Sequence, residues 1–167
     1  ILEWIKHNKF LHGPHYISVM ECGHRIPVFL FALRVLDNLK ENERRLILQT
    51  VFEHAWIIEK RLSLFSSLGN HTVVECMGLV IAGCIFSNSK EGRRWLKTGI
   101  CILEKEVNHQ VLDDGGPIEQ SFQYHRFVID LYLCVVSFLE DNNLYDCSGI
   151  KKRIKKGEEF LSAFKGN

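Results

Sequence analysis

Two polar stretches of this chain carry side chains that could perform acid–base chemistry. The first is segment 69–75, which contains Asn70, His71 and Glu75, and the second is segment 112–126, which ends in Tyr124-His125-Arg126. Each stretch stands at the start of a predicted helix, where a scaffold can direct side chains toward a ligand. Together they predict an active site.

The first stretch suits the binding of an anion. Asn70 and His71 lie at a predicted helix N-terminus, where unpaired N–H groups and the positive end of the helix dipole favour a carboxylate or sulfate. Glu75 follows His71 by one turn and could accept a hydrogen bond from the imidazole, fixing its tautomer. Alternatively, Asn70 only caps the helix, because Asn is a favoured N-cap residue.

The second stretch follows a tight Asp-Gly-Gly-Pro turn. Tyr124 also continues the apolar stripe of its own predicted helix, so it could be a core tyrosine whose hydroxyl is satisfied locally. His125 and Arg126 would then be ordinary helix-surface residues. Composition alone decides neither stretch.

Hydrophobic periodicity predicts an all-α chain with no convincing strand alternation. Apolar residues recur at helical spacing, and breaks at turn residues delimit helices near 17–37, 42–64, 71–87, 90–110, 120–141 and 149–165. Pro27 should kink the first helix or mark its true start. Short loops make three antiparallel hairpins, which favour an α/α solenoid or an incomplete α/α toroid over a four-helix bundle.

Composition bounds the remaining possibilities. The 167 residues with 46% apolar content suit a single domain spanning 1–167. A formal charge of +1 gives no field that would recruit nucleic acid, and the longest apolar runs are too short for membrane insertion. The opening Ile1-Leu2 has no initiator Met or leader, which indicates a piece of a longer protein.

Three other features have simple interpretations. Six cysteines without metal spacing are expected to be buried or idle thiols. The basic run Lys151–Lys156 lies on a predicted amphipathic helix and is expected to be a solvated face, since no aromatic residues interleave for base stacking. His12 and His15 lack a regular element to fix them and HExxH is absent, so no metal and no cofactor are expected.

Several motifs in order give the chain a family resemblance. It resembles the α/α-toroid domain of the heparinase II/III-like polysaccharide lyases, which include heparin-sulfate and alginate lyases. Upstream, Gly13-Pro14-His15-Tyr16 and segment 20–26 look like that family's preceding helix. The motifs are Asn70-His71 with Glu75, Gly78 and Gly83, then Arg93-Arg94-Trp95-Leu96, Leu103-Glu104-Lys105-Glu106, Gln110-Val111-Leu112-Asp113-Asp114-Gly115-Gly116, Glu119-Gln120-Ser121 and Tyr124-His125.

The resemblance implies β-elimination on a uronic-acid polysaccharide of heparan-sulfate, alginate or exopolysaccharide type. That reaction must neutralise the uronate carboxylate, remove the C5 proton and protonate the oxygen leaving C4. By resemblance, Asn70 neutralises the carboxylate, Tyr124 acts as base, acid or both, and His71 assists. Glu75 would not contact the substrate but would help to orient these residues.

Four further residues are candidates for lining the substrate cleft. His125 and Arg126 are expected to contact sugar or sulfate, while Glu21 and Arg25 are either a lining pair or a structural ion pair. Many members of the family carry a second Asn where this chain has Gly69, so local geometry is expected to differ there.

The resemblance also implies partners and a location. In the family a β-sandwich domain follows the toroid and the cleft lies between them. The missing C-terminal domain of the same chain is therefore an expected partner, supplying a further catalytic His. By the same analogy the protein is periplasmic or secreted, although six unpaired cysteines disfavour an oxidising compartment.

The competing hypothesis is a non-catalytic helical solenoid that binds glycans or proteins. The lyase hypothesis instead predicts that Asn70 and Tyr124 converge on one cleft with His71 nearby.

Overall fold

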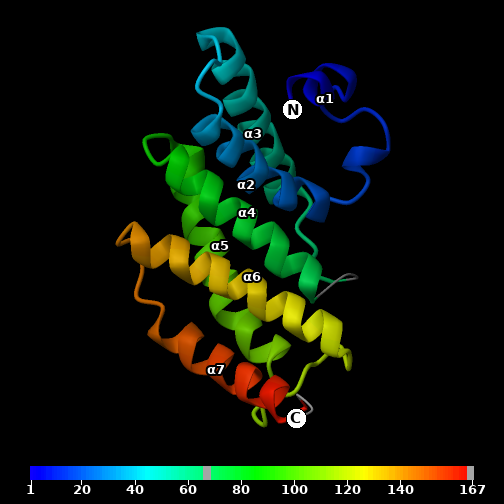
Figure 1. Cartoon of the computed structure of the whole chain (residues 1–167), viewed down its shortest axis with the longest axis vertical. Coiled ribbons are helices and arrows are strands. Elements are labelled where there is room, and N and C mark those ends of the chain that lie inside the picture. The colour runs from blue at the N-terminus through cyan, green and yellow to red at the C-terminus, as the bar shows by residue number, and fades with distance from the viewer. Residues whose placement is uncertain (66–68, 165–167) are drawn as a thin grey trace.

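The computed structural model describes residues 1–65 and 69–164 and is built from helices (Figure 1). The only β pairing in these ranges is an isolated bridge between Val111 and Pro117, so the all-α prediction is confirmed. In chain order the elements are α1 (Leu2–His7), the 3₁₀ helix η1 (Pro14–Tyr16), α2 (Met20–Val35), α3 (Glu41–Lys60), α4 (Asn70–Ile85), α5 (Lys90–Gln110), α6 (Phe122–Asp141) and α7 (Ser148–Ala163).

Six of these helices form the three predicted hairpins. Helix α2 packs on α3, α4 on α5, and α6 on α7. The first helices of the hairpins are also neighbours, because α4 packs on both α2 and α6, and Figure 1 shows these three running side by side. Their starts, which carry the candidate residues, therefore lie along one edge of the layer.

Helix α4 is the centre of the molecule. Twelve of its sixteen residues are buried, and the buried stretch runs unbroken from Thr72 to Gly83. Glycines let its neighbours approach closely: a Cβ on Gly78 would lie 2.9 Å from Gly23 Cα in α2, and one on Gly83 would lie 2.5 Å from Leu96 N in α5. A helix apolar all round needs such neighbours on every side.

The predicted helix bounds agree best where a capping side chain marks them. Helix α5 has the predicted bounds, and Ser89 Oγ accepts from Gly92 N at 2.9 Å as its N-cap. Helix α2 begins at Met20 rather than 17 and contains Pro27, so Pro27 does not mark its start. Helix α3 ends at Lys60 rather than 64, because the next residues turn back to bond α4. Part of the predicted break at 66–70, and residue 165, lie outside the described residues.

The basic run 151–156 and the six cysteines agree with the interpretations given from the sequence. Ile150 and Ile154 of α7 are buried while Lys151, Lys152 and Lys155 are exposed, so the basic run is a solvated helix face. All six cysteines are free; Cys22, Cys76 and Cys147 are buried, whereas Cys101 and Cys134 are exposed. Within the described ranges, no helix combines the length and apolar character needed to cross a bilayer.

Candidate active site

A carboxylate from a distant loop holds the first residue of α4. Glu119 Oε1 accepts from the Asn70 backbone N at 2.9 Å, and Asn70 Nδ2 donates to Oε1 and Oε2 at 3.2 and 3.0 Å. The negative charge suits the positive end of the helix dipole. Asn70 is thus the first helical residue, paired with Glu119, and its side chain does not serve as the N-cap.

Gly69 makes the room for this contact. It is buried with φ of +119°, a region that favours glycine, and a Cβ there would lie 2.5 Å from Glu119 Oε1. The glycine in place of the second Asn therefore coincides with the close approach of Glu119.

Tyr124 is exposed in the first turn of α6. Ser121 is the N-cap of this helix, and its Oγ accepts from Tyr124 N at 3.4 Å. The residue is 51% exposed, so the core-tyrosine alternative is wrong: the buried face of α6 begins with the neighbouring His125, and Tyr124 lies on another face. Tyr124 and Glu119 line one closed pocket together with Gln110 and the buried His125, and this pocket has no room for a water molecule. Glu119 therefore joins Asn70 to the pocket that Tyr124 lines.

His71 faces a different hollow on the same end of α4. It is half-buried and lines a cavity of about 330 Å³ with Arg61, Ser18 and Ser63. Polar and cationic side chains share this wall, so the cavity suits a polar or anionic group.

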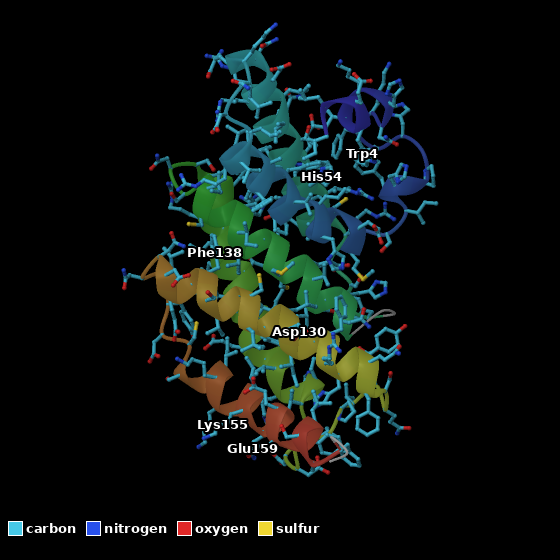
Figure 2. The ribbon with its side chains drawn as sticks, viewed as in Figure 1. Trp4, His54, Asp130, Phe138, Lys155 and Glu159 are labelled. Carbon is cyan, nitrogen blue, oxygen red and sulfur yellow. The ribbon has the colours of Figure 1, made fainter. Side chains whose placement is uncertain are left out.

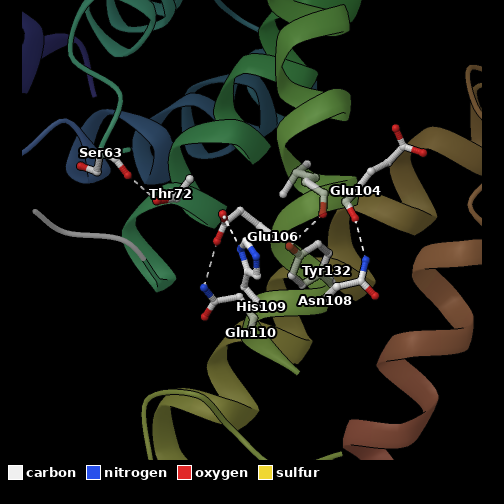
Figure 3. A network of polar contacts seen from close by, with 9 residues as sticks. Ser63, Thr72, Glu104, Glu106, Asn108, His109, Gln110 and Tyr132 are labelled. Atoms are coloured by element: carbon white, nitrogen blue, oxygen red, sulfur yellow. Dashed lines mark hydrogen bonds and ion pairs between the residues drawn. The ribbon is translucent and has the colours of Figure 1, made fainter. Parts of the chain in front are cut away.

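Glu75 binds the loop after α3, which differs from the predicted hydrogen bond to His71. Its carboxylate accepts from Ser63 N and Ser63 Oγ at 2.7 and 2.8 Å. Thr72 Oγ1 donates to Ser63 O in turn, as Figure 3 shows. Burial raises the pKa of Glu75, and the hydrogen bonds from Ser63 and the nearby His71 oppose this. Glu75 therefore fixes the wall of the cavity that His71 lines.

A second buried network lies in α5 beneath the site (Figure 3). Gln110 Nε2 donates to Glu106 Oε2 at 3.1 Å, and Tyr132 OH donates to Leu103 O at 3.1 Å. Burial raises the pKa of Tyr132 well above its ordinary value. Tyr132 is thus a satisfied core tyrosine, whereas the Tyr124 side chain is open to solvent.

His125 is buried, contrary to the expectation that it lies on the helix surface. It is 2% exposed, lies 3.3 Å from the position of a Cβ on Gly157, and its ring centroid is 5.8 Å from that of Phe160. Neither ring nitrogen makes a hydrogen bond of good geometry with the described residues; burial lowers the pKa of His125, and the nearby backbone of Gly115 and Gly157 opposes this. The side chain packs between α6 and α7, so it is not exposed at a surface that a sugar could contact.

Arg126 is exposed and pairs loosely with Asp130 at 3.7 Å. It lines a groove of about 760 Å³ between α6 and α7 with Phe122, Phe127 and Leu161. The structure does not bring it to the pocket of Tyr124 and Glu119.

Glu21 and Arg25 form a structural ion pair. Their side chains are 3.6 Å apart, and Arg25 is only 16% exposed. Its Nη1 donates to His15 O at 2.8 Å, and its guanidinium carbon lies 4.9 Å from the Trp4 ring centroid. Of the two alternatives, the structure favours the one in which the pair anchors the N-terminal segment on α2.

Glu119 is the residue that sequence reasoning missed. Glu119 belongs to the motif Glu119-Gln120-Ser121, which contributes to the family resemblance, but nothing in the pattern points to a partner in α4. Among the described residues, no group of three or more His, Cys, Asp or Glu side chains is arranged to hold a metal ion.

Comparison with protein families gives one match over most of the chain. The family described as Heparinase II/III N-terminus matches residues 9–160. Heparin-sulfate lyase from Bacteroides stercoris is 38% identical over 71 residues, which are 42% of this chain and 11% of that protein. The corresponding enzyme of Pedobacter heparinus is 38% identical over 69 residues, 41% of this chain and 10% of that protein.

Solved structures share the fold. The crystal structure of heparinase III matches with a TM-score of 0.80 at 25% identity, covering 97% of this chain and 26% of that one. A mutant heparan sulfate lyase from Pedobacter heparinus gives a TM-score of 0.72 at 20% identity, covering 96% and 26%. These matches confirm the predicted partial α/α toroid. The aligned segments span about a tenth of the curated relatives, and the chain spans about a quarter of the solved ones.

Proposed function

Since the chain belongs to the heparinase II/III N-terminus family, we propose that it supplies part of the active site of a polysaccharide lyase. The reaction is β-elimination on a uronic-acid-containing polysaccharide. Its curated relatives are named heparin-sulfate lyases, which favours a heparan-type substrate over alginate or a bacterial exopolysaccharide.

The convergence of Asn70 and Tyr124 around Glu119 carries this proposal. The two residues lie on different helices, yet Glu119 bonds Asn70 and lines one pocket with Tyr124. A neutral amide donor at a helix N-terminus and an exposed phenol hydroxyl are the two groups that elimination next to a carboxylate needs.

Each group has a proposed role. The Asn70 amide and the N-terminal end of α4 stabilise the uronate carboxylate as charge builds on it after loss of the C5 proton. Tyr124, as its phenolate, removes that proton, and the hydroxyl formed in this way then delivers it to the oxygen leaving C4. Because a tyrosine hydroxyl ordinarily ionises near pH ~10, a base near neutrality needs cationic neighbours. His71 lines a separate cavity, so we propose that the rest of the completed cleft supplies them.

We also propose that the active enzyme is a longer protein. The chain covers about a quarter of the heparinase III structure, and the cleft in this proposal is completed by a β-sandwich domain of the same chain, which supplies a further histidine. A polysaccharide substrate fits a periplasmic or secreted enzyme.

The test is an eliminative cleavage assay on the full-length protein. Elimination creates a C4–C5 double bond conjugated with the carboxylate, so ultraviolet absorbance should rise on heparan sulfate and less on alginate or other uronates. Tyr124→Phe should abolish the rise while retaining the fold and polymer binding. A wild-type protein that binds these polymers without any rise would sink the lyase proposal and favour a glycan-binding solenoid.

A further inference from the structure

The Asn70 amide has more than one rotamer available unless something holds it. In the structure a single carboxylate occupies both the main-chain and the side-chain donor of this residue: Glu119 Oε1 accepts from Asn70 N, and both Glu119 oxygens lie within 3.2 Å of Asn70 Nδ2. Hydrogen bonds to an ionised acceptor are about twice as strong as neutral ones.

This contact fixes which end of the amide faces outward. The carboxylate only accepts, so it selects Nδ2 over Oδ1 as its partner. A single Nδ2 hydrogen shared between the two carboxylate oxygens is enough for this contact, which leaves the second hydrogen and Oδ1 for a ligand. Without Glu119, the amide can flip or rotate about its side-chain bonds.

The surroundings are arranged around the contact. Gly69 adopts φ of +119° and has no Cβ, and a Cβ would stand 2.5 Å from Glu119 Oε1. Glu119 itself lies in the loop that leads to α6, two residues before Ser121, whose hydroxyl caps the turn bearing Tyr124. The carboxylate thereby ties the helix of Asn70 to the start of the helix of Tyr124.

We propose that Glu119 is a positioning residue that orients the Asn70 amide and sets its placement relative to Tyr124. The catalytic part of this inference rests on the proposed lyase function. It goes beyond helix capping, because a cap would need only the bond from the Asn70 backbone N–H.

The variant Glu119→Gln distinguishes helix capping from orientation of the Asn70 amide. Its side-chain oxygen can still accept from Asn70 N, but its NH₂ group replaces the second acceptor of Asn70 Nδ2. In the full-length enzyme we expect kcat to fall roughly 10- to 100-fold, as for misplacement of a reacting group by about 1 Å, with KM changed less than about twofold. Glu119→Asp keeps the charge but is one methylene shorter, so it should lose kcat as well.

Glu159→Gln is the matched control, because Glu159 is an exposed carboxylate on α7 (Figure 2). It should match the wild type in kcat and thermal midpoint. If Glu119→Gln lowered the thermal midpoint while the folded enzyme kept wild-type kcat, Glu119 would be a cap only and the inference would be overturned. Full kcat in Glu119→Asp would also overturn it, because charge alone would then suffice.

A neutron crystal structure of Glu119→Gln, which locates the amide hydrogens, decides the positioning without any substrate. We expect a turned Asn70 amide on an unchanged α4 backbone, and an amide left in place would refute the inference. If the wild type cleaves no uronate polymer, the proposed function fails, and this structural comparison still decides the role of Glu119.

Discussion

Two polar clusters show how this fold uses charged and amide side chains in different ways. The arginine cluster, which comprises Trp4, His15, Tyr16, Glu21 and Arg25, closes on itself: the guanidinium is largely buried, hydrogen-bonded and stacked on a ring. The Asn70 corner, which comprises Gly69, Asn70, His71, Glu119 and Tyr124, holds its amide on one side only. Asn70 and His71 stay half-buried and Tyr124 is half-exposed.

The difference lies in what remains unused. A buried guanidinium whose N–H donors already bond groups of the protein stabilises the fold, and it has few donors free to bind a ligand. The Asn70 amide, held by the Glu119 carboxylate alone, keeps one donor and one acceptor that can bind a ligand. Changes in the arginine cluster should therefore lower stability and spare catalysis, and changes at the Asn70 corner should do the reverse.

The largest expected effect is that of Asn70→Ala on activity. Loss of a preorganised donor for developing negative charge typically costs about 10²–10³ in kcat, while stability should change by about 1 kcal/mol at most, since the Asn70 backbone bond to Glu119 remains. Asn142→Ala removes an exposed amide that bonds only Phe138 O and should leave activity intact. Equal losses of activity in both variants would erase the contrast.

The next effect is acid destabilisation around His54. This residue is fully buried against Trp4, Tyr16 and Phe29 (Figure 2 labels Trp4 and His54), and burial lowers its pKa from 6.5 to about 4. The unfolded chain takes up the proton first, so stability falls as pH drops from ~6.5 toward ~4, by about 3 kcal/mol in total. His125, whose pKa burial also lowers, acts with the same sign.

Urea unfolding at a series of pH values tests this effect. His54→Phe keeps a ring in the cluster and should flatten much of the slope below pH ~6.5, leaving the part due to His125 and acidic groups. An unchanged slope in His54→Phe would place the titrating group elsewhere.

The smallest effect is expected for Arg25→Lys. Lysine keeps the charge but loses the planar fork and the stacking on Trp4, so the free energy of unfolding should drop by about 1–2 kcal/mol with kcat unchanged. Arg126→Lys, at an exposed ion pair, should change stability by less than about 0.5 kcal/mol. A kcat loss in Arg25→Lys would mean that the arginine cluster reaches the substrate after all.

Local patterns were sufficient to predict the six long helices and their hairpins, but not the short helices α1 and η1. The bounds of α5 follow from its periodic stripe and from Ser89, a local cap that sequence shows directly. The burial of His125 was also readable, because Val128, Ile129 and Tyr132 follow it at helical spacing on the buried face of α6. Placing it on the surface followed from grouping it with Tyr124, one position away and on another face.

Contacts distant in sequence could not be predicted. The pairing of Asn70 with Glu119 depends on how α4 and the loop before α6 pack in three dimensions, and no periodicity encodes it. The same holds for Glu75, where an i, i+4 rule suggested His71 but Ser63, twelve residues earlier and in a folded-back loop, provides both bonds. Residue type and spacing therefore predicted where the long helices lie, but not which residues from distant segments form hydrogen bonds with Asn70 and Glu75.

The enclosure of α4 has a consequence during synthesis. Its apolar surface is covered by α2 and α3, which leave the ribosome earlier, and by α5 and α6, which leave it later. At ~5–20 residues per second, the apolar faces of α4 that later pack on α5 and α6 stay exposed for several seconds before α6 is synthesised. Slow codons placed just after α4 would lengthen this exposure.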